Sequence, residues 1–138
     1  MMGNPRNANG AARRALRRRV AAMGKPCWIC TLPIDYSLPA LHPDSFELDE
    51  LTPVADGGDP LEFENVAPAH RICNQWRGRK SVRRVESIRA AALRAFGMWS
   101  CASEFVTRAR SAAKIRVKSK ESRSKARYSA NLQNSRKW

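Results

Sequence analysis

Two pairs of potential metal ligands, Cys27 with Cys30 and His70 with Cys73, constrain the fold of this 138-residue chain more than any other feature. Structural zinc sites take four Cys or His ligands in a closed tetrahedron, usually supplied as two closely spaced pairs. The spacing therefore predicts a zinc ion that clamps the base of the inserted segment 31–69. The alternative is a set of buried thiols with a surface histidine.

The length of the chain makes such a metal useful, because a small core offsets little of the conformational entropy lost on folding. The first residues contain no apolar run that could serve as a signal peptide, and no stretch approaches the ~18 apolar residues of a membrane span. We therefore expect a cytoplasmic protein with reduced cysteines and no membrane partner. Cys101 has no partner at ligand spacing and is expected to be a buried or idle thiol.

The net charge of +14 is divided unevenly along the chain. Residues 1–26 carry seven bases and no acid, residues 27–80 carry four bases and nine acids, and residues 81–138 carry fifteen bases and three acids. An acidic centre between basic flanks is expected where carboxylates gather cations while the flanks neutralise phosphates. A generic solubilising surface is the alternative, and we favour nucleic acid as the partner.

Hydrophobic periodicity predicts a mixture of helices and short strands, and hence an α+β fold. Helices are expected over 11–23, 71–77 and 82–96, and extended segments over 46–53 and 66–68. From Ser111 onward Lys, Arg, Ser and Asn dominate, which predicts a flexible tail. The expected organisation is a basic N-terminal arm, a core domain, a helical extension and a basic tail, at 1–26, 27–80, 81–110 and 111–138.

Between Cys27 and Lys80 the chain also carries an ordered series of short motifs: Asp49-Glu50-Leu51-Thr52-Pro53, Gly57-Gly58, Asn65-Val66, His70-Arg71-Ile72-Cys73-Asn74 and Arg77. In order and spacing this series resembles the zinc-containing, bacteriophage-type branch of the His-Asn-His (HNH) endonuclease family. The resemblance implies a small ββα-metal core stapled by structural zinc, which basic helices would flank here. It also implies metal-dependent cutting or nicking of duplex DNA, in phage packaging or mobile-element machinery.

The resemblance further implies a role for each of four polar residues. Asp49 and Asn74 would hold a catalytic Mg²⁺ or Mn²⁺ ion, for which oxygen ligands are suited. The amide of Asn65 would brace the hairpin and orient the base. Hydrolysis of a phosphodiester needs a base to activate water, and Glu50 stands where the family has its general-base histidine.

Glu50 leaves three readings open. It could act as the base, although an unperturbed Glu with a pKa of ~4.3 is a weaker base than imidazole. It could be an additional metal ligand, or the site could be impaired. His42 could supply an imidazole, although a histidine in a His-Pro turn is more often exposed. In an ideal strand Asp49 and Glu50 point to opposite faces, so both reach one cation only if the strand twists or bulges.

Seven basic side chains near the acidic centre are the predicted DNA contacts: Arg13, Arg17, Arg77, Arg79, Lys80, Arg83 and Arg84. The basic segments contain few aromatic residues, which favours backbone contact with a duplex over stacking on single-stranded bases. Three functions remain open. They are an HNH-type nuclease, a catalytically impaired zinc-stapled DNA-binding module, and a structural protein whose basic tail binds RNA or a larger complex. The sequence gives no oligomeric state.

Overall fold

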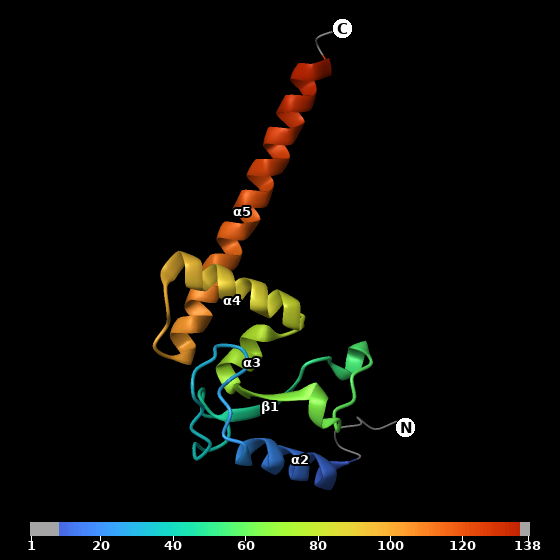
Figure 1. Ribbon diagram of the computed structural model, residues 1–138, viewed down its shortest axis with the longest axis vertical. Coiled ribbons are helices and arrows are strands. Elements are labelled where there is room, and N and C mark those ends of the chain that lie inside the picture. The colour runs from blue at the N-terminus through green and yellow to red at the C-terminus, as the bar shows by residue number, and fades with distance from the viewer. Residues whose placement is uncertain (1–8, 136–138) are drawn as a thin grey trace.

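The computed structural model describes the backbone of residues 9–135, and side chains up to Ile115 and again over 122–127. In chain order the elements are α2 (Gly10–Ala22), β1 (Phe46–Glu50), the short 3-10 turns η1 (Val54–Asp56) and η2 (Phe63–Asn65), β2 (Val66–His70), α3 (Arg71–Arg77), α4 (Val82–Phe96) and α5 (Ala102–Ser135) (Figure 1). The chain is α+β, as its sequence predicts. Within the described residues, no helix combines the length and apolar character that a membrane span needs.

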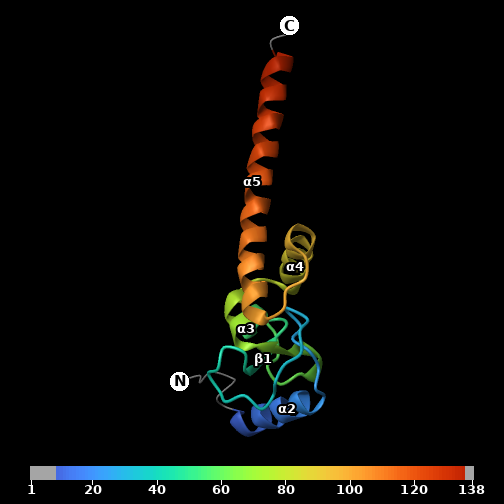
Figure 2. The same ribbon diagram turned by 90° about the vertical axis from the view of Figure 1, so that its left-hand side faces the viewer.

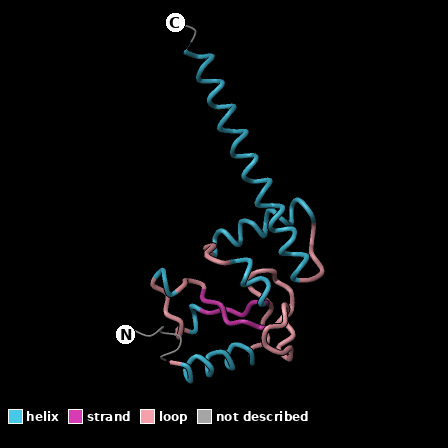
Figure 3. Tube along the Cα trace, turned by 180° about the vertical axis from the view of Figure 1, so that it is seen from behind, coloured by secondary structure: helices cyan, strands magenta, loops and turns pink. Residues whose placement is uncertain are grey.

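A two-stranded antiparallel sheet lies at the centre of the domain (Figure 3). Phe46 of β1 pairs with His70 of β2, and Glu50 pairs with Val66. The first strand ends before the predicted limit of 53, because the side-chain amide of Asn65 bonds the backbone N–H and C=O of Thr52 in place of a strand partner. Helix α3 follows β2 without a loop, which gives the local order strand, strand, helix.

Helices enclose the sheet from two sides (Figures 1 and 2). On one side lies α2, which buries Leu16 and Val20 and packs on both strands. On the other side α3 packs on the sheet, and α5 packs on both α3 and α4. The ring of Phe105 in α5 meets Trp76 and Trp99 edge-on and completes the core.

Helix α5 replaces the flexible tail that the sequence predicts from Ser111 onward. Buried Phe105, Val106, Ala109 and Ala112 fix its first turns, and the helix then runs away from the domain to Ser135 (Figure 2). Packing supplies the costly helix nucleus, and each further residue adds one backbone hydrogen bond. The abundant Lys, Arg and Ala of this segment favour that continuation. The predicted arm and tail also include residues 1–8 and 136–138, which lie outside the described range.

Candidate functional site

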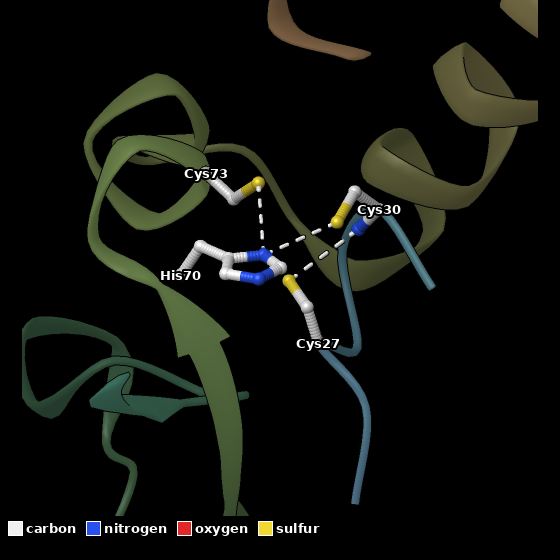
Figure 4. A group of neighbouring side chains, drawn as sticks. All are labelled: Cys27, Cys30, His70 and Cys73. Atoms are coloured by element: carbon white, nitrogen blue, oxygen red, sulfur yellow. Dashed lines mark hydrogen bonds between the residues drawn. The ribbon is translucent and has the colours of Figure 1, made fainter. Parts of the chain in front are cut away.

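The two predicted ligand pairs converge on one buried point (Figure 4). Cys27 and Cys30 come from the turn after α2, while His70 ends β2 and Cys73 lies in the first turn of α3. The four ligand atoms lie within 4.8 Å of one another. His70 Nδ1 is 3.3 Å from Cys30 Sγ and 3.9 Å from Cys73 Sγ. We call these four residues the Cys₃His cluster.

The geometry of the Cys₃His cluster suits a tetrahedral metal such as zinc. Ligands around zinc at the usual Zn–S distance lie about 3.8 Å apart, which is within the observed spread. The other ring nitrogen of His70, Nε2, lies 3.0 Å from the carbonyl of Pro33 and donates its hydrogen there. This contact leaves Nδ1 free to bind a metal and fixes the orientation of the ring.

One side chain of α4 and one of the loop between α4 and α5 brace the turn that holds the first ligand pair. Arg89 of α4 donates to the carbonyls of Trp28 and Ile29, at 2.8 and 3.0 Å. The indole of Trp99 donates to the carbonyl of Cys30 at 2.7 Å. No sequence motif marks either contact, because the partners lie some 60 residues apart and meet only in the fold.

Without an ion, the Cys₃His cluster distributes its protons unevenly. Burial alone would lower the pKa of His70, but hydrogen bonds and charge interactions with Cys27 and Cys30 outweigh it and raise that pKa to about 10. Burial opposes ionisation of Cys27, yet hydrogen bonds from its neighbours lower its pKa overall. The pKa of Cys73 is raised by its hydrogen bonds to the other two thiols and by burial. Metal binding must therefore displace protons from His70 and Cys73.

A second candidate site adjoins this cluster, in a cleft of ≈490 Å³ between α2 and α3. Its polar lining includes Glu47, Asp49 and Glu50 of β1 and Asn74 of α3. We call it the carboxylate cleft. It brings together three of the four residues that the sequence predicts as catalytic. Among the described residues, only the Cys₃His cluster gathers three or more His, Cys, Asp or Glu ligand atoms closely, so the three carboxylates of the cleft lie further apart.

Asp49 is buried but keeps one oxygen available. Its Oδ2 accepts hydrogen bonds from the indole of Trp28 at 2.9 Å and from the guanidinium of Arg77 at 2.7 Å. Its Oδ1 has no such donor, and no described side-chain oxygen is both fully buried and without a partner, so Oδ1 is open to the cleft. Burial raises the pKa of Asp49, and the hydrogen bonds and charge of Arg77 oppose that rise.

Asn74 offers a second open oxygen. Its Nδ2 donates to Glu47 Oε1 at 3.4 Å, while the amide oxygen accepts no hydrogen bond from the described residues. Glu47 is not among the predicted site residues. The available signal is its position two residues before Asp49, which places both on the same face of β1.

Glu50 faces the other way, toward α2. Its Oε1 lies 3.4 Å from the guanidinium of Arg13, which also donates to the carbonyls of Pro60 and Leu48. Asp49 and Glu50 therefore follow the alternation of an ideal strand, and no bulge turns them to a common point. Both still line the carboxylate cleft, because it extends around the end of β1.

Asn65 braces the loop between the strands, the position that the resemblance implies for it. Its Oδ1 accepts from the N–H of Thr52, and its Nδ2 donates to the carbonyls of Thr52 and Asp59, at 2.9, 3.0 and 3.0 Å. Gly58 fits under this amide because it has no side chain: an added Cβ would lie 1.8 Å from the Thr52 oxygen. The motif Gly57-Gly58 thus has a steric cause at its second position.

The seven predicted DNA contacts divide into two groups. Arg77 is only 1% exposed, and its guanidinium bonds Asp49 and the carbonyls of Glu50, Leu51 and Lys80. This internal role replaces the predicted grip on phosphate. On α2, Arg13 is tied to the hairpin, and Arg17 donates to the carbonyl of Phe46 and lies over its ring. Of the other four, Lys80 is half-buried, and three are exposed: Arg79, Arg83 and Arg84.

Two other polar residues lie away from the carboxylate cleft. His42 is exposed, accepts a hydrogen bond from the N–H of Asp44, and lines a separate hollow with Pro33 and Cys101. It is not in position to serve as the base of the cleft. Cys101 is exposed rather than buried, because it precedes the first turn of α5 at the surface.

Comparison of the chain with protein-family models, with curated proteins and with solved structures found no match in any of the three searches.

Proposed function

We propose that this protein is a zinc-stapled, metal-dependent endonuclease of the HNH type, which hydrolyses phosphodiester bonds in DNA. The observation that carries the proposal is the carboxylate cleft, where open oxygens of Asp49 and Asn74 lie with Glu50 at the end of a strand–strand–helix unit. The Cys₃His cluster would hold zinc as a structural staple at the base of the same unit. Its four protein ligands leave no open position for substrate.

Each residue of the cleft has a chemical task in this proposal. Asp49 and Asn74 would bind one Mg²⁺ or Mn²⁺ ion, which characteristically keeps several waters and takes few protein ligands. Such an ion supplies charge stabilisation at the phosphate. Glu50 would accept the proton of the attacking water. Its ion pair with Arg13 limits the directions in which it can point.

Relaxation of supercoiled plasmid by the purified protein tests the proposal directly. We expect cleavage by the zinc-loaded protein with Mg²⁺ or Mn²⁺, none when neither ion is added, and at least about a 100-fold loss in the Asn74→Ala and Glu50→Ala variants. Gln75→Ala is the matched control, because Gln75 is the exposed neighbour of Asn74 on α3. Zinc content is measured for every variant to show that the fold is retained. Full cleavage by zinc-loaded Asn74→Ala would contradict the assigned cation site.

One observation favours a second candidate, the zinc-stapled DNA-binding module without cleavage. Both carboxylates with an assigned catalytic role already have a cationic neighbour, Arg77 for Asp49 and Arg13 for Glu50. A protein that has no need of a catalytic ion could keep such pairs permanently. Intact duplex binding without cleavage under any divalent ion would favour this candidate.

A further inference from the structure

Beyond the carboxylate cleft lies a group of basic side chains that have no carboxylate partner among the described residues: Arg79, Lys80, Arg83, Arg84 and Arg110. Two lie in the turn between α3 and α4, two lie in the first turn of α4, and Arg110 is on α5. Such a concentration of like charge costs free energy unless anions neutralise it.

The group is a spatial cluster and not only a run in the sequence. Besides being partly buried, Lys80 feels the positive charges of Arg84 and Arg110, and all three effects lower its pKa. The ammonium of Lys80 caps α3 through the carbonyls of Trp76 and Arg77. Lys114 is exposed on α5, one turn beyond Arg110 and on the same face of the helix.

The cluster is also continuous with the carboxylate cleft. Arg79, Lys80 and Arg83 line a hollow of ≈300 Å³ together with Pro53. Pro53 also lines the carboxylate cleft. Asp56 also lines this hollow, so a strand of phosphates that continues from the cleft over the α3–α4 turn meets three basic side chains and one carboxylate.

We infer that Arg79, Lys80, Arg83, Arg84, Arg110 and Lys114 form a phosphate track for duplex DNA that leads from the carboxylate cleft onto α5. The link to a cleavage site rests on the proposed function, whereas the track itself binds DNA whether or not the cleft cuts it. Its position makes the contact one-sided, so bound DNA extends from the cleft toward α5.

Duplex DNA fits this surface better than single strands. The ammonium of Lys80 lies over the ring of Trp76, which packs on Phe105, and both rings are buried and cannot stack on bases. Ala112 is the last of the described α5 residues to be buried, and the helix then runs away from the domain (Figure 1). Arg123, Lys125 and Arg127 on it are exposed. A helix about 10–12 Å wide matches the major groove of B-DNA, which is about 12 Å wide, while the deep, narrow major groove of A-form RNA excludes it.

Fluorescence anisotropy with a labelled duplex of about 30 base pairs, longer than the ~51 Å helix can span, tests the track. The zinc-loaded protein is used without added Mg²⁺ or Mn²⁺, so that no cleavage is expected. For the Arg84→Glu/Arg110→Glu double variant we expect at least about tenfold weaker binding. We also expect the slope of log affinity against log salt to be smaller by about 2. The matched control is the Arg94→Glu/Arg18→Glu double variant. It changes the net charge by the same amount, at two exposed arginines outside the track.

Equal losses in the double variant and its control would overturn the track, as would tighter binding to an RNA duplex of the same length. A second measurement uses the wild-type protein: the duplex should protect Lys114 from acetylation, with exposed Lys25 as the internal control. Equal modification of Lys114 with and without DNA would also overturn the track. Plasmid cleavage is scored separately. Track-dependent binding without cleavage would refute only the nuclease, and cleavage with track-independent binding would refute only the track.

Discussion

Asp49 uses its two carboxylate oxygens for different purposes. Oδ2 joins the indole of Trp28 to the guanidinium of Arg77, while Oδ1 stays open to the carboxylate cleft. In the sequence, Trp28 lies between the ligands Cys27 and Cys30 of the Cys₃His cluster. The hydrogen bond from its indole to Asp49 therefore connects that cluster to the cleft. A buried carboxylate fixed in this way presents its free oxygen in one direction only.

Substitution of Arg77 by Met should strongly destabilise the fold. The change removes the partner of buried Asp49 and leaves the carbonyls of Glu50 and Leu51 without a donor. Breaking a buried ion pair on one side costs about 3–5 kcal/mol. Urea unfolding measures the change, with Arg79→Met as the exposed control, expected within about 0.5 kcal/mol of wild type. A change in unfolding free energy as small as that of the control would contradict the burial of the Arg77 guanidinium.

Thr31→Gly should stabilise the turn that carries Cys27 and Cys30. Thr31 adopts a positive φ of 70°, a left-handed conformation that costs an L-residue about 1–2 kcal/mol. Glycine avoids that strain but loses more entropy on folding, which leaves a gain of about 0.5–1 kcal/mol. Thr31→Ala keeps the Cβ and is expected to give no such gain. Thermal unfolding of the zinc-loaded proteins compares the two, and equal stability would refute the strain.

At the scale of elements, the loop between the strands depends on Asn65 and Gly58. Gly58→Ala should destabilise the protein by about 1–3 kcal/mol, because the new Cβ meets the Thr52 carbonyl and the Asn65 amide. Gly57→Ala tests a different cause at the neighbouring position, where φ is 89° and no atom lies within 4 Å of an added Cβ. Urea unfolding should give the larger loss for Gly58→Ala, and plasmid cleavage should fall with it. A larger loss for Gly57→Ala would contradict the steric explanation.

The predicted elements agree closely with the structure where periodicity and turn chemistry are strong. The helices expected over 11–23, 71–77 and 82–96 are present within one residue, and both strands are present. The first strand is shorter than expected because Asn65, some 13 residues away, takes over its last hydrogen bonds. Helix α5 differs most, since composition alone does not reveal that buried residues between Ala102 and Ala112 nucleate it.

At the scale of the whole molecule, the Cys₃His cluster joins the turn after α2 to the β2–α3 junction. Chelation of its metal should therefore unfold or strongly destabilise the domain, because a structural zinc site contributes its binding energy to folding. Circular dichroism during EDTA titration measures this loss. Cys73→Ser should lose zinc, whereas Cys101→Ser, at an exposed thiol outside the cluster, should retain it. Retention of a full zinc equivalent by Cys73→Ser would refute the ligand assignment.

Zinc affinity should fall as pH falls. In the metal-free protein the pKa of His70 is raised from 6.5 to about 10, so its contribution to stability is complete below pH 6.5 and disappears as pH rises through about 10. Zinc needs the neutral ring and a Cys73 thiolate, so binding displaces protons that low pH restores. Competition with a chromophoric chelator measures the zinc affinity from pH 8 to pH 6. For each displaced proton, the affinity should fall about tenfold per pH unit. An affinity independent of pH would contradict this protonation pattern.

Much of the candidate site follows from sequence spacing, and the rest depends on where side chains meet in three dimensions. Spacing predicts the four cluster ligands, because each pair lies within one local turn. The brace of Asn65 is implied only by the resemblance of its motif to those of HNH endonucleases. Spacing does not distinguish an arginine that points outward from one that points inward. Arg77 is internal because its neighbours offer an acceptor for each of its donor groups, an arrangement that only the packed hairpin creates.

The free length of α5 has a consequence for how the protein moves in solution. A compact chain of 138 residues has a radius of gyration of about 14 Å. Helix α5 alone, with 34 residues, is about 51 Å long and projects from one side of the domain (Figure 2). The molecule is therefore elongated, with a compact domain at one end, and it tumbles anisotropically. As a monomer it should elute from a size-exclusion column earlier than a compact protein of the same mass.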